Sequence, residues 1–157
     1  MNPTMKSLEL KIPPPLVALA LAFLMWFASS LAQPIEVPFA IRLGIALALV
    51  IVGQSISISG MVAFRRAKTT INPIKASAAS SLVSSGVYRF TRNPMYLGLL
   101  LTLLAWAVFL SNPVALLFVP VFVLYMNRYQ IHPEERVLSS LFDTEYSAYK
   151  ERVRRWL

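Results

Sequence analysis

Two polar stretches of this sequence hold the side chains whose types and spacing could do chemistry. The first runs from Ser80 to Gly98 and contains serines, two tyrosines, two arginines and an asparagine, and the second is His132-Pro133-Glu134-Glu135. Histidine and glutamate accept and release protons, and a glutamate also accepts strong hydrogen bonds from the hydroxyl and amino groups of a ligand. The sequence therefore offers His132, Glu134 and Glu135 as candidate bases, preceded in the chain by a possible ligand-binding loop.

The composition excludes several classes of site and of protein. The 157 residues include no cysteine and a single histidine, which excludes a thiolate metal site, a cysteine nucleophile, a disulfide framework and a histidine-rich metal cluster. Hydrophobic residues make up 57% of the chain, charged residues only 14%, and the mean hydropathy is +0.61. These values are too apolar for a disordered chain or a water-soluble domain. We therefore expect an all-α integral membrane protein without a bound metal.

Four apolar segments must position the two polar stretches, and they predict about four transmembrane helices. The segments cover residues 14–32, 38–64, 94–110 and 113–131. Ser111-Asn112-Pro113 leaves room only for a tight turn, so the last two segments should form a helical hairpin. Ser30-Leu31-Ala32 resembles a signal-peptide cleavage site, but the apolar stretch before it is longer than that of a usual signal peptide.

Small and polar residues inside these segments predict how the helices meet. In the second segment, Gly53 and Ser57 allow close helix packing, and Gln54 can form a hydrogen bond with a neighbouring helix. Pro120 removes a backbone donor from the fourth segment, which predicts a bend there. A short amphipathic helix should begin near Asp143 and carry an apolar face. That face, made of Tyr146, Tyr149, Val153 and Trp156, suits an anionic membrane surface or packing against the protein.

The positive charges are distributed asymmetrically along the chain. Fourteen of the fifteen Lys and Arg residues lie before the first apolar segment, between the second and third, or after the fourth. The positive-inside rule then places both termini, the loop 65–93 and the tail 132–157 in the cytoplasm. Because the basic residues alternate with apolar spans, the net charge of +8 points to a lipid bilayer and not to nucleic acid. We expect one multi-pass membrane domain, 1–157, whose active site faces the cytoplasm.

Taken by type alone, the polar residues also have a purely structural explanation. Arg89 and Arg92 suit a cytoplasmic boundary, Tyr88 and Tyr96 suit the membrane–water interface, and the two glutamates suit the first turn of a helix. The order of the pieces favours a function. The order is Leu82-Val83-Ser84-Ser85-Gly86-Val87-Tyr88, Arg92-Asn93-Pro94-Met95-Tyr96-Leu97-Gly98, the hairpin, Glu134-Glu135-Arg136-Val137-Leu138, and a tail from Glu145 to Val153.

This combination resembles the isoprenylcysteine carboxyl methyltransferase family, which is related to the phospholipid N-methyltransferases. The resemblance covers about residues 68–155, with matching order and spacing, and implies S-adenosylmethionine as the cofactor. It also implies a cofactor site formed by the loop before the third segment and the acidic pair after the fourth. The implied cofactor contacts are Ser80, Ser81, Leu82, Val83, Tyr88, Asn93, Pro94, Met95, Tyr96, Gly98, Glu134 and Glu135.

The sequence departs from the family pattern at three positions. Asn93 stands where the eukaryotic enzymes have histidine, and Asp143 replaces a usual glycine. Gln130 occupies the position of an arginine that the prenylcysteine enzymes use for the substrate, with Arg128 close to it in the sequence. The resemblance thus makes Arg128 and Gln130 the substrate candidates, and Arg128 joins His132 and Glu135 as a catalytic candidate.

These observations predict an S-adenosylmethionine-dependent membrane methyltransferase that acts on a lipophilic acceptor. A carboxylate acceptor is already ionised and needs no base, whereas an amine acceptor must lose a proton. A prenylcysteine carboxylate, a phospholipid amine and a small hydrophobic thiol all remain open as acceptors. The alternative function is a non-catalytic membrane scaffold or subunit that binds anionic lipid or a partner protein through its basic face.

Overall fold

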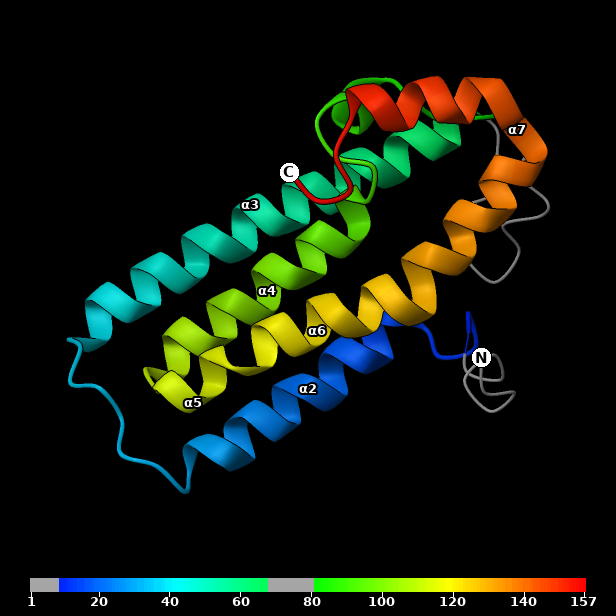
Figure 1. Cartoon of the computed structure of the whole chain (residues 1–157). Coiled ribbons are helices and arrows are strands. Elements are labelled where there is room, and N and C mark those ends of the chain that lie inside the picture. Colours follow the sequence, from blue (N-terminus) through cyan, green and yellow to red (C-terminus); the bar gives the residue numbers. More distant parts are fainter. Residues whose placement is uncertain (1–8, 68–80) are drawn as a thin grey trace.

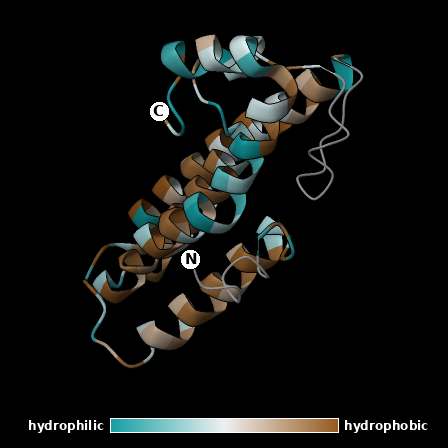
Figure 2. Cartoon of the chain, turned by 45° about the vertical axis from the view of Figure 1, so that its right-hand side comes forward, coloured by the Kyte–Doolittle hydropathy of each residue, from teal (hydrophilic) through white to brown (hydrophobic). Residues whose placement is uncertain are grey.

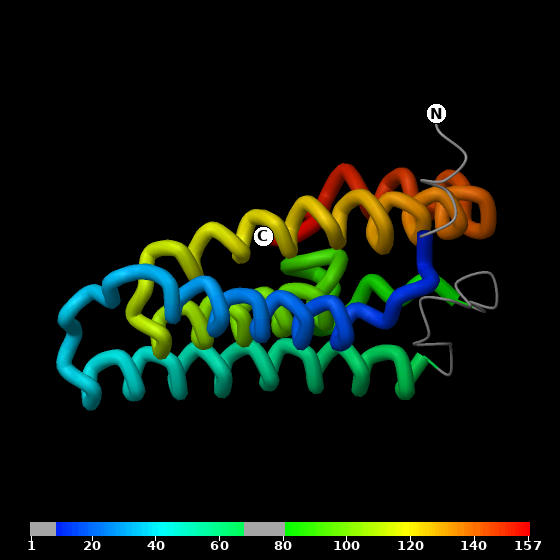
Figure 3. Tube along the Cα trace, turned by 90° about the horizontal axis from the view of Figure 1, so that it is seen from below, coloured from blue at the N-terminus to red at the C-terminus, as the bar shows by residue number. Residues whose placement is uncertain are grey.

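The computed structural model describes residues 9–67 and 81–157, and every secondary-structure element in these ranges is a helix. The all-α class predicted from the composition is therefore confirmed. Figures 1 and 3 show α2, α3, α4 and α6 as neighbouring rods, with the second half of α7 lying across one end. The elements are α2 (Pro14–Ser29), α3 (Phe39–Arg66), the 3₁₀ turn η2 (Gly86–Arg89), α4 (Pro94–Leu110), α5 (Pro113–Leu116), α6 (Phe118–Met126), the π-helical η3 (Asn127–Ile131) and α7 (His132–Arg152).

A tight turn joins α4 to α5 and makes them a hairpin. Ser111 has the left-handed backbone angles φ 52° and ψ 40°, which end α4. Asn112 Oδ1 then accepts a hydrogen bond from the Val114 amide at 3.0 Å and caps α5. The Asn112 side chain also donates to the carbonyl oxygens of Ser29 and Ala32, at the end of α2. The chain therefore runs back toward the end of the bundle where α4 began.

Helices α3 and α4 approach closely because small residues face each other. A Cβ added to Gly53 would lie 2.9 Å from the Gly98 carbonyl oxygen, and one added to Gly98 would overlap Ser57 Oγ. Gln54 Nε2 also donates to Thr102 Oγ1 at 3.0 Å. The close packing and the interhelical hydrogen bond predicted for this part of the chain are both confirmed. They hold the first turns of α4 against α3.

The helical run after the hairpin is interrupted once between α5 and α6 and changes direction inside α7. Helix α5 ends at Leu116 and α6 begins at Phe118, close to Pro120, which cannot donate a backbone hydrogen bond to the Leu116 carbonyl. The change of direction lies inside α7, where Asp143 has the non-helical angles φ 30° and ψ −104°. The sequence predicted a new helix from this position. Figure 1 shows the second half of α7 returning over the end of the bundle.

The apolar face of this returning half packs against the protein and not away from it. Tyr146, Tyr149 and Val153 are 2%, 4% and 7% exposed, and they form one cluster with Val83 and Tyr88. Of the two expectations for this amphipathic stretch, packing against the protein is the one observed. The cluster brings the loop before α4 together with the end of α7.

Two helices among the described residues are long and apolar enough to cross a membrane. These are α3, with 28 residues, and the helical stretch Pro113–Arg152, which is made of α5, α6, η3 and α7. Helices α2 and α4 are also apolar and have 16 and 17 residues. Large apolar side chains are exposed along α2 and α3, among them Leu19 at 66% and Ile51 at 65%. Figure 2 shows the apolar rods and the more hydrophilic second half of α7.

Candidate active site

The centre of the candidate site is a contact between the first turns of α4 and α7. Pro94 is the first residue of α4, where its fixed backbone angle suits a helix start. Pro133 is the second residue of α7, which follows directly after η3. The Tyr96 hydroxyl there donates a short hydrogen bond to Glu134 Oε1. Although Glu134 is not fully sealed from solvent, its carboxyl is densely surrounded by protein. Burial raises the pKa of Glu134 to about 7, against the lowering effect of the Tyr96 hydrogen bond.

Tyrosine side chains surround this carboxyl. Tyr149 donates from its hydroxyl to the Tyr88 carbonyl oxygen at 2.7 Å, which fastens η2 to α7. Burial, then the neighbouring Tyr149 and Glu134, raise the pKa of Tyr88 well above its usual value. Burial also raises the pKa of Tyr146 to about 12. These hydroxyl groups are therefore protonated at neutral pH and can act as hydrogen-bond donors.

Glu135, next to Glu134, is engaged by two arginines. Arg155 donates to it with Nε at 3.1 Å and Nη2 at 2.6 Å, as a bidentate pair. Arg92 Nη1 lies 3.3 Å from Glu135 Oε1, which is close enough for ion pairing but is not aligned as a hydrogen bond. The two adjacent glutamates therefore have different surroundings. Glu135 joins the loop before α4 to the C-terminal tail.

The C-terminal tail runs alongside that loop. The Arg92 amide donates to the Arg154 carbonyl at 3.0 Å, and Asn93 Nδ2 donates to the Arg155 carbonyl at 2.9 Å. Trp156 Nε1 donates to Asn127 Oδ1 at 3.1 Å, at the start of η3. The tail thus connects the start of α4 to the end of α6 and forms one wall of the candidate site.

The other residues predicted to contact the cofactor form the frame of this site. Ser80 lies outside the described residues. Ser81 Oγ donates to the Ala67 carbonyl at 3.4 Å, Val83 is buried beside Tyr88, and Leu82 packs against the same cluster. Three further residues pack along α3: Pro94 against Gly60, the Met95 carbonyl as an acceptor for Ser57 Oγ at 3.4 Å, and Gly98 against Gly53 and Ser57.

The structure separates the predicted substrate residues from Glu134 and Tyr96. Arg128 Nη1 pairs with Glu9 Oε1 at 3.1 Å. Gln130 is 1% exposed and donates from Nε2 to the Ile12 carbonyl at 2.8 Å. His132, the third of these neighbouring candidates, is exposed. Among the described residues, these side chains face the N-terminal segment or solvent and make no hydrogen bond to Glu134 or Tyr96.

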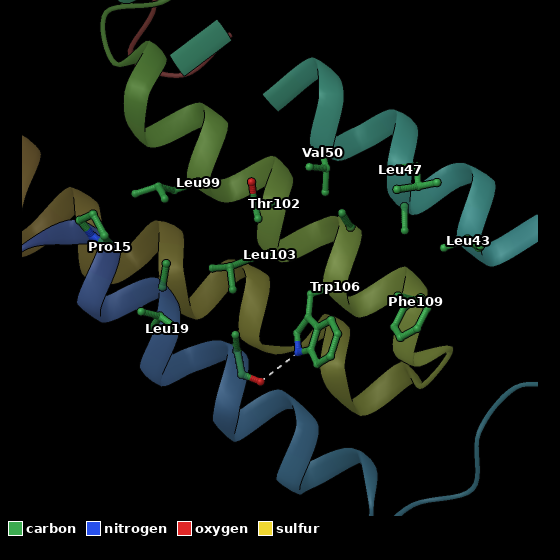
Figure 4. Close-up of a pocket in the computed structure, with 14 residues that line it drawn as sticks. Pro15, Leu19, Leu43, Leu47, Val50, Leu99, Thr102, Leu103, Trp106 and Phe109 are labelled. Atoms are coloured by element: carbon green, nitrogen blue, oxygen red, sulfur yellow. Dashed lines mark hydrogen bonds between the residues drawn. The ribbon is translucent and has the colours of Figure 1, made fainter. Parts of the chain in front are cut away.

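An apolar cavity lies between α2, α3 and α4. It has a volume of about 530 Å³, and Figure 4 shows Leu19 from α2, Leu47 from α3, and Leu103 and Trp106 from α4 around it. Trp106 Nε1 donates to the Ala22 carbonyl at 3.0 Å, which leaves its ring on the cavity wall. Because Leu103 follows Tyr96 by seven residues, both lie on nearly the same face of α4. The cavity therefore extends along the helix face that begins at the candidate site.

The region of the chain that matches a known protein family contains most of this site. The family model described as phospholipid methyltransferase matches residues 41–145, about two thirds of the chain. The chain belongs to the phospholipid methyltransferase family. The matched region contains Tyr88, Tyr96 and Glu134, and the family resemblance predicted from the sequence motifs is confirmed.

Curated relatives of this member of the phospholipid methyltransferase family include protein-S-isoprenylcysteine O-methyltransferases. Protein-S-isoprenylcysteine O-methyltransferase A of Arabidopsis thaliana is 33% identical over 107 residues, which are 68% of this chain and 54% of the relative. The Saccharomyces cerevisiae enzyme is 33% identical over 108 residues, which are 67% of this chain and 44% of the relative. The chain spans about half the length of these relatives. An uncharacterized protein of Haemophilus influenzae is 54% identical over 63 residues, 40% of this chain and its own full length. No solved structure matches significantly.

The structure adds residues that the family motifs did not single out. Arg92 is mostly buried, and its Nε and Nη1 have no hydrogen-bond partner among the described residues. Arg92 and Glu134 both act electrostatically on Tyr146, so the three side chains share one neighbourhood. Arg155 pairs with Glu135 from the end of the chain. Arg92 stands in the Arg92-Asn93-Pro94 motif but was predicted only as a residue of the cytoplasmic boundary, and nothing in the local sequence distinguishes Arg155 from the other basic residues of the tail.

Proposed function

We propose that this protein is a membrane methyltransferase that uses S-adenosylmethionine and acts on a lipophilic acceptor. The carrying observation is the partly buried Glu134–Tyr96 hydrogen bond, which lies inside the region matched to the phospholipid methyltransferase family. Burial raises the pKa of this carboxyl to about 7, and perturbed pKa values cluster at functional sites.

The hydrogen-bonding groups of the candidate site fit this cofactor. S-adenosylmethionine carries amino and ribose hydroxyl donors, a carboxylate and a positively charged sulfonium. Glu134 supplies acceptor oxygens, and Arg92 supplies two buried nitrogens, Nε and Nη1, that have no hydrogen-bond partner in the described residues, although Arg92 also pairs with Glu135. Bound here, S-adenosylmethionine would supply an electrophilic methyl group. Glu134 and Arg92 would orient it, while the buried tyrosines would exclude water from the site.

The cavity favours an acceptor with a long apolar part. Its walls carry side chains of α2, α3 and α4, and on α4 they run from Phe109 to Leu99, about one helical turn from Tyr96. An apolar tail in this cavity would direct the reacting head group toward the Tyr96 end of α4. Burial of apolar surface at about 25 cal/mol per Å² would supply much of the binding free energy.

Glu134 is the proposed base for an amine acceptor. Its pKa near 7 lets it take a proton at neutral pH, whereas Glu135 is held by two arginines and His132 is exposed. A carboxylate acceptor needs no base. Because Gln130 is neutral, buried and bonded to the Ile12 carbonyl, we expect weak methylation of prenylcysteine analogues and better activity on an acceptor without that carboxylate.

The proposed topology has four spans and a cytoplasmic active site. The supporting observations are the apolar helices and the basic residues around the candidate site. Arg92, Arg154 and Arg155 all lie at the end of the bundle where α4 starts and the tail returns. By the positive-inside rule that end faces the cytoplasm.

A methyl-transfer assay tests the proposal. Purified protein receives radiolabelled S-adenosylmethionine with total lipid, a farnesylcysteine analogue or a small hydrophobic thiol. Label should enter a lipid-soluble product. Ala18→Leu, which narrows the cavity, should raise the KM for a long-chain acceptor, while Ala20→Leu, an exposed change on the same helix, should leave it unchanged. No labelled product from any acceptor would favour the scaffold function, and equal effects of the two variants would exclude the cavity as the acceptor site.

A further inference from the structure

The N-terminal segment Glu9–Ile12 lies across the π-helical η3. The Leu10 amide donates to the Tyr129 carbonyl at 3.0 Å, and Gln130 Nε2 donates to the Ile12 carbonyl at 2.8 Å. Glu9 reaches the arginines on both sides, with one carboxylate oxygen on Arg128 and the other on Arg136. Two hydrogen bonds thus hold the main chain of the segment at Leu10 and Ile12. The Glu9 carboxylate lies between the guanidinium groups of Arg128 and Arg136.

Arg128 and Arg136 form an anion-binding pair that Glu9 occupies. The Glu9 side chain is only 12% exposed, whereas the Arg128 and Arg136 side chains are 29% and 55% exposed. Guanidinium groups match the oxygens of carboxylate and of phosphate equally well. A phosphate that approached from outside could therefore contact both arginines in place of Glu9.

An exposed apolar stripe leads along the helix to this pair. Leu117, Val121 and Leu124 are 65%, 47% and 68% exposed. Their spacing of four, three and then four residues to Arg128 places all of them on one face of α6 and η3. The combination of an apolar stripe and a cationic end matches an acyl chain that continues into a phosphate headgroup.

The backbone of the N-terminal segment is strained where it crosses η3. Leu10 has the left-handed backbone angle φ 58°, which is strained for a residue with a side chain. The Gln130 side-chain oxygen is buried without a hydrogen-bond partner among the described residues. The segment is therefore bound over η3 under strain, and η3 is a π-helix, a form that often occurs at functional sites.

We propose that Arg128 and Arg136 bind the phosphate of an anionic phospholipid whose acyl chain lies along Leu117, Val121 and Leu124, and that Glu9 occupies the pair when lipid is absent. The lipid phosphate and the Glu9 carboxylate compete for the same N–H groups. Lipid binding therefore releases the N-terminal segment from η3. This site is separate from Glu134 and Tyr96, and it does not depend on methyl transfer.

Native mass spectrometry of the delipidated full-length protein tests the site with dioleoyl phosphatidylglycerol and dioleoyl phosphatidylcholine. Glu9→Gln should raise the affinity for phosphatidylglycerol about tenfold and that for phosphatidylcholine much less, because the choline cation beside its phosphate is repelled by the two arginines. Adding Arg128→Gln and Arg136→Gln should remove the gain. Glu36→Gln, in the loop between α2 and α3, is the matched control and should change nothing. An unchanged phosphatidylglycerol affinity in Glu9→Gln, or an equal gain for both lipids, would overturn the proposal.

Hydrogen exchange of the unaltered protein gives a second test that does not depend on how well the variants fold. The Leu10 amide, bonded to the Tyr129 carbonyl, should exchange faster in phosphatidylglycerol nanodiscs than in phosphatidylcholine nanodiscs. Millimolar inorganic phosphate in phosphatidylcholine nanodiscs should not reproduce the effect, because it lacks an acyl chain. Equal exchange in the two lipids would contradict the competition, and an equal effect of inorganic phosphate would exclude the lipid as the specific ligand.

Discussion

The Tyr96 hydroxyl donates to the Glu134 carboxylate, and this one hydrogen bond joins the start of α4 to the start of α7. The two residues are 38 positions apart in the chain. The hairpin at Ser111 and Asn112 brings them together, because it returns the chain to the end of the bundle where α4 begins. The candidate site thus depends on the turn at the opposite end of the hairpin.

The raised pKa of Glu134 makes stability depend on pH. Its pKa is about 7 in the folded protein and 4.5 in the unfolded reference, so between these values the folded state binds more protons. The contribution of Glu134 to the free energy of unfolding should therefore be most favourable below pH 4.5. It should fall by on the order of 3 kcal/mol as the pH rises to 7. Glu134→Gln removes the titration and should flatten the difference between melting temperatures at pH 5 and pH 8. Parallel pH profiles for both proteins would contradict the assignment.

Gly98 should tolerate no side chain. A Cβ there would overlap Ser57 Oγ and the Gly53 carbonyl oxygen, so Gly98→Ala must push α4 away from α3. We expect a loss of about 1–3 kcal/mol or more in unfolding free energy, measured by thermal or denaturant unfolding in detergent. Gly44→Ala is the control, because a Cβ at Gly44 meets nothing within 4 Å. It should be neutral or stabilise α3 by up to about 1 kcal/mol. Equal losses would mean that the close approach is unimportant.

The bidentate pair between Arg155 and Glu135 should hold the C-terminal tail in place. Arg155→Lys keeps the charge but loses the two parallel hydrogen bonds, so the tail should separate more often from Arg92 and Asn93. Hydrogen exchange of the Arg92 amide, which is bonded to the Arg154 carbonyl, should become faster by about tenfold. Arg154→Lys changes an exposed side chain and should leave this exchange rate unaltered. The same acceleration in both variants would show that the pair does not hold the tail.

Local sequence features predicted the helical framework. Apolar segments, the prolines at helix starts, the Ser111-Asn112 turn and the new direction at Asp143 each depend on residues within one or two turns. The contacts between α3 and α4 were also predictable, because Gly53 and Ser57 are spaced to face a neighbouring helix.

The different surroundings of Glu134 and Glu135 were not predictable from their type. Neighbouring positions on a helix point about 100° apart, so one carboxylate meets Tyr96 and the other meets Arg92 and Arg155. These partners come from distant parts of the chain, and no local pattern identifies them.

The surroundings of Arg128 and Gln130 depend on an even longer connection. Their partners, Glu9 and Ile12, lie 119 and 118 positions away. The family resemblance predicts a substrate role at this place in the chain, but it contains no information about the N-terminal segment that covers Arg128 and Gln130. Only the assembled fold shows this contact.

The most direct test of the account is the binding of S-adenosylmethionine to the detergent-purified protein, measured by calorimetry at pH 8, where Glu134 is ionised. The unaltered protein should bind it saturably below millimolar concentration. Glu134→Gln removes charge-assisted hydrogen bonds worth about 1.5–3 kcal/mol, so the affinity should fall by about 10- to 100-fold. Glu151→Gln, an exposed change near the end of α7, should bind as the unaltered protein does. Absence of binding at millimolar S-adenosylmethionine, or equal losses in the two variants, would contradict the account.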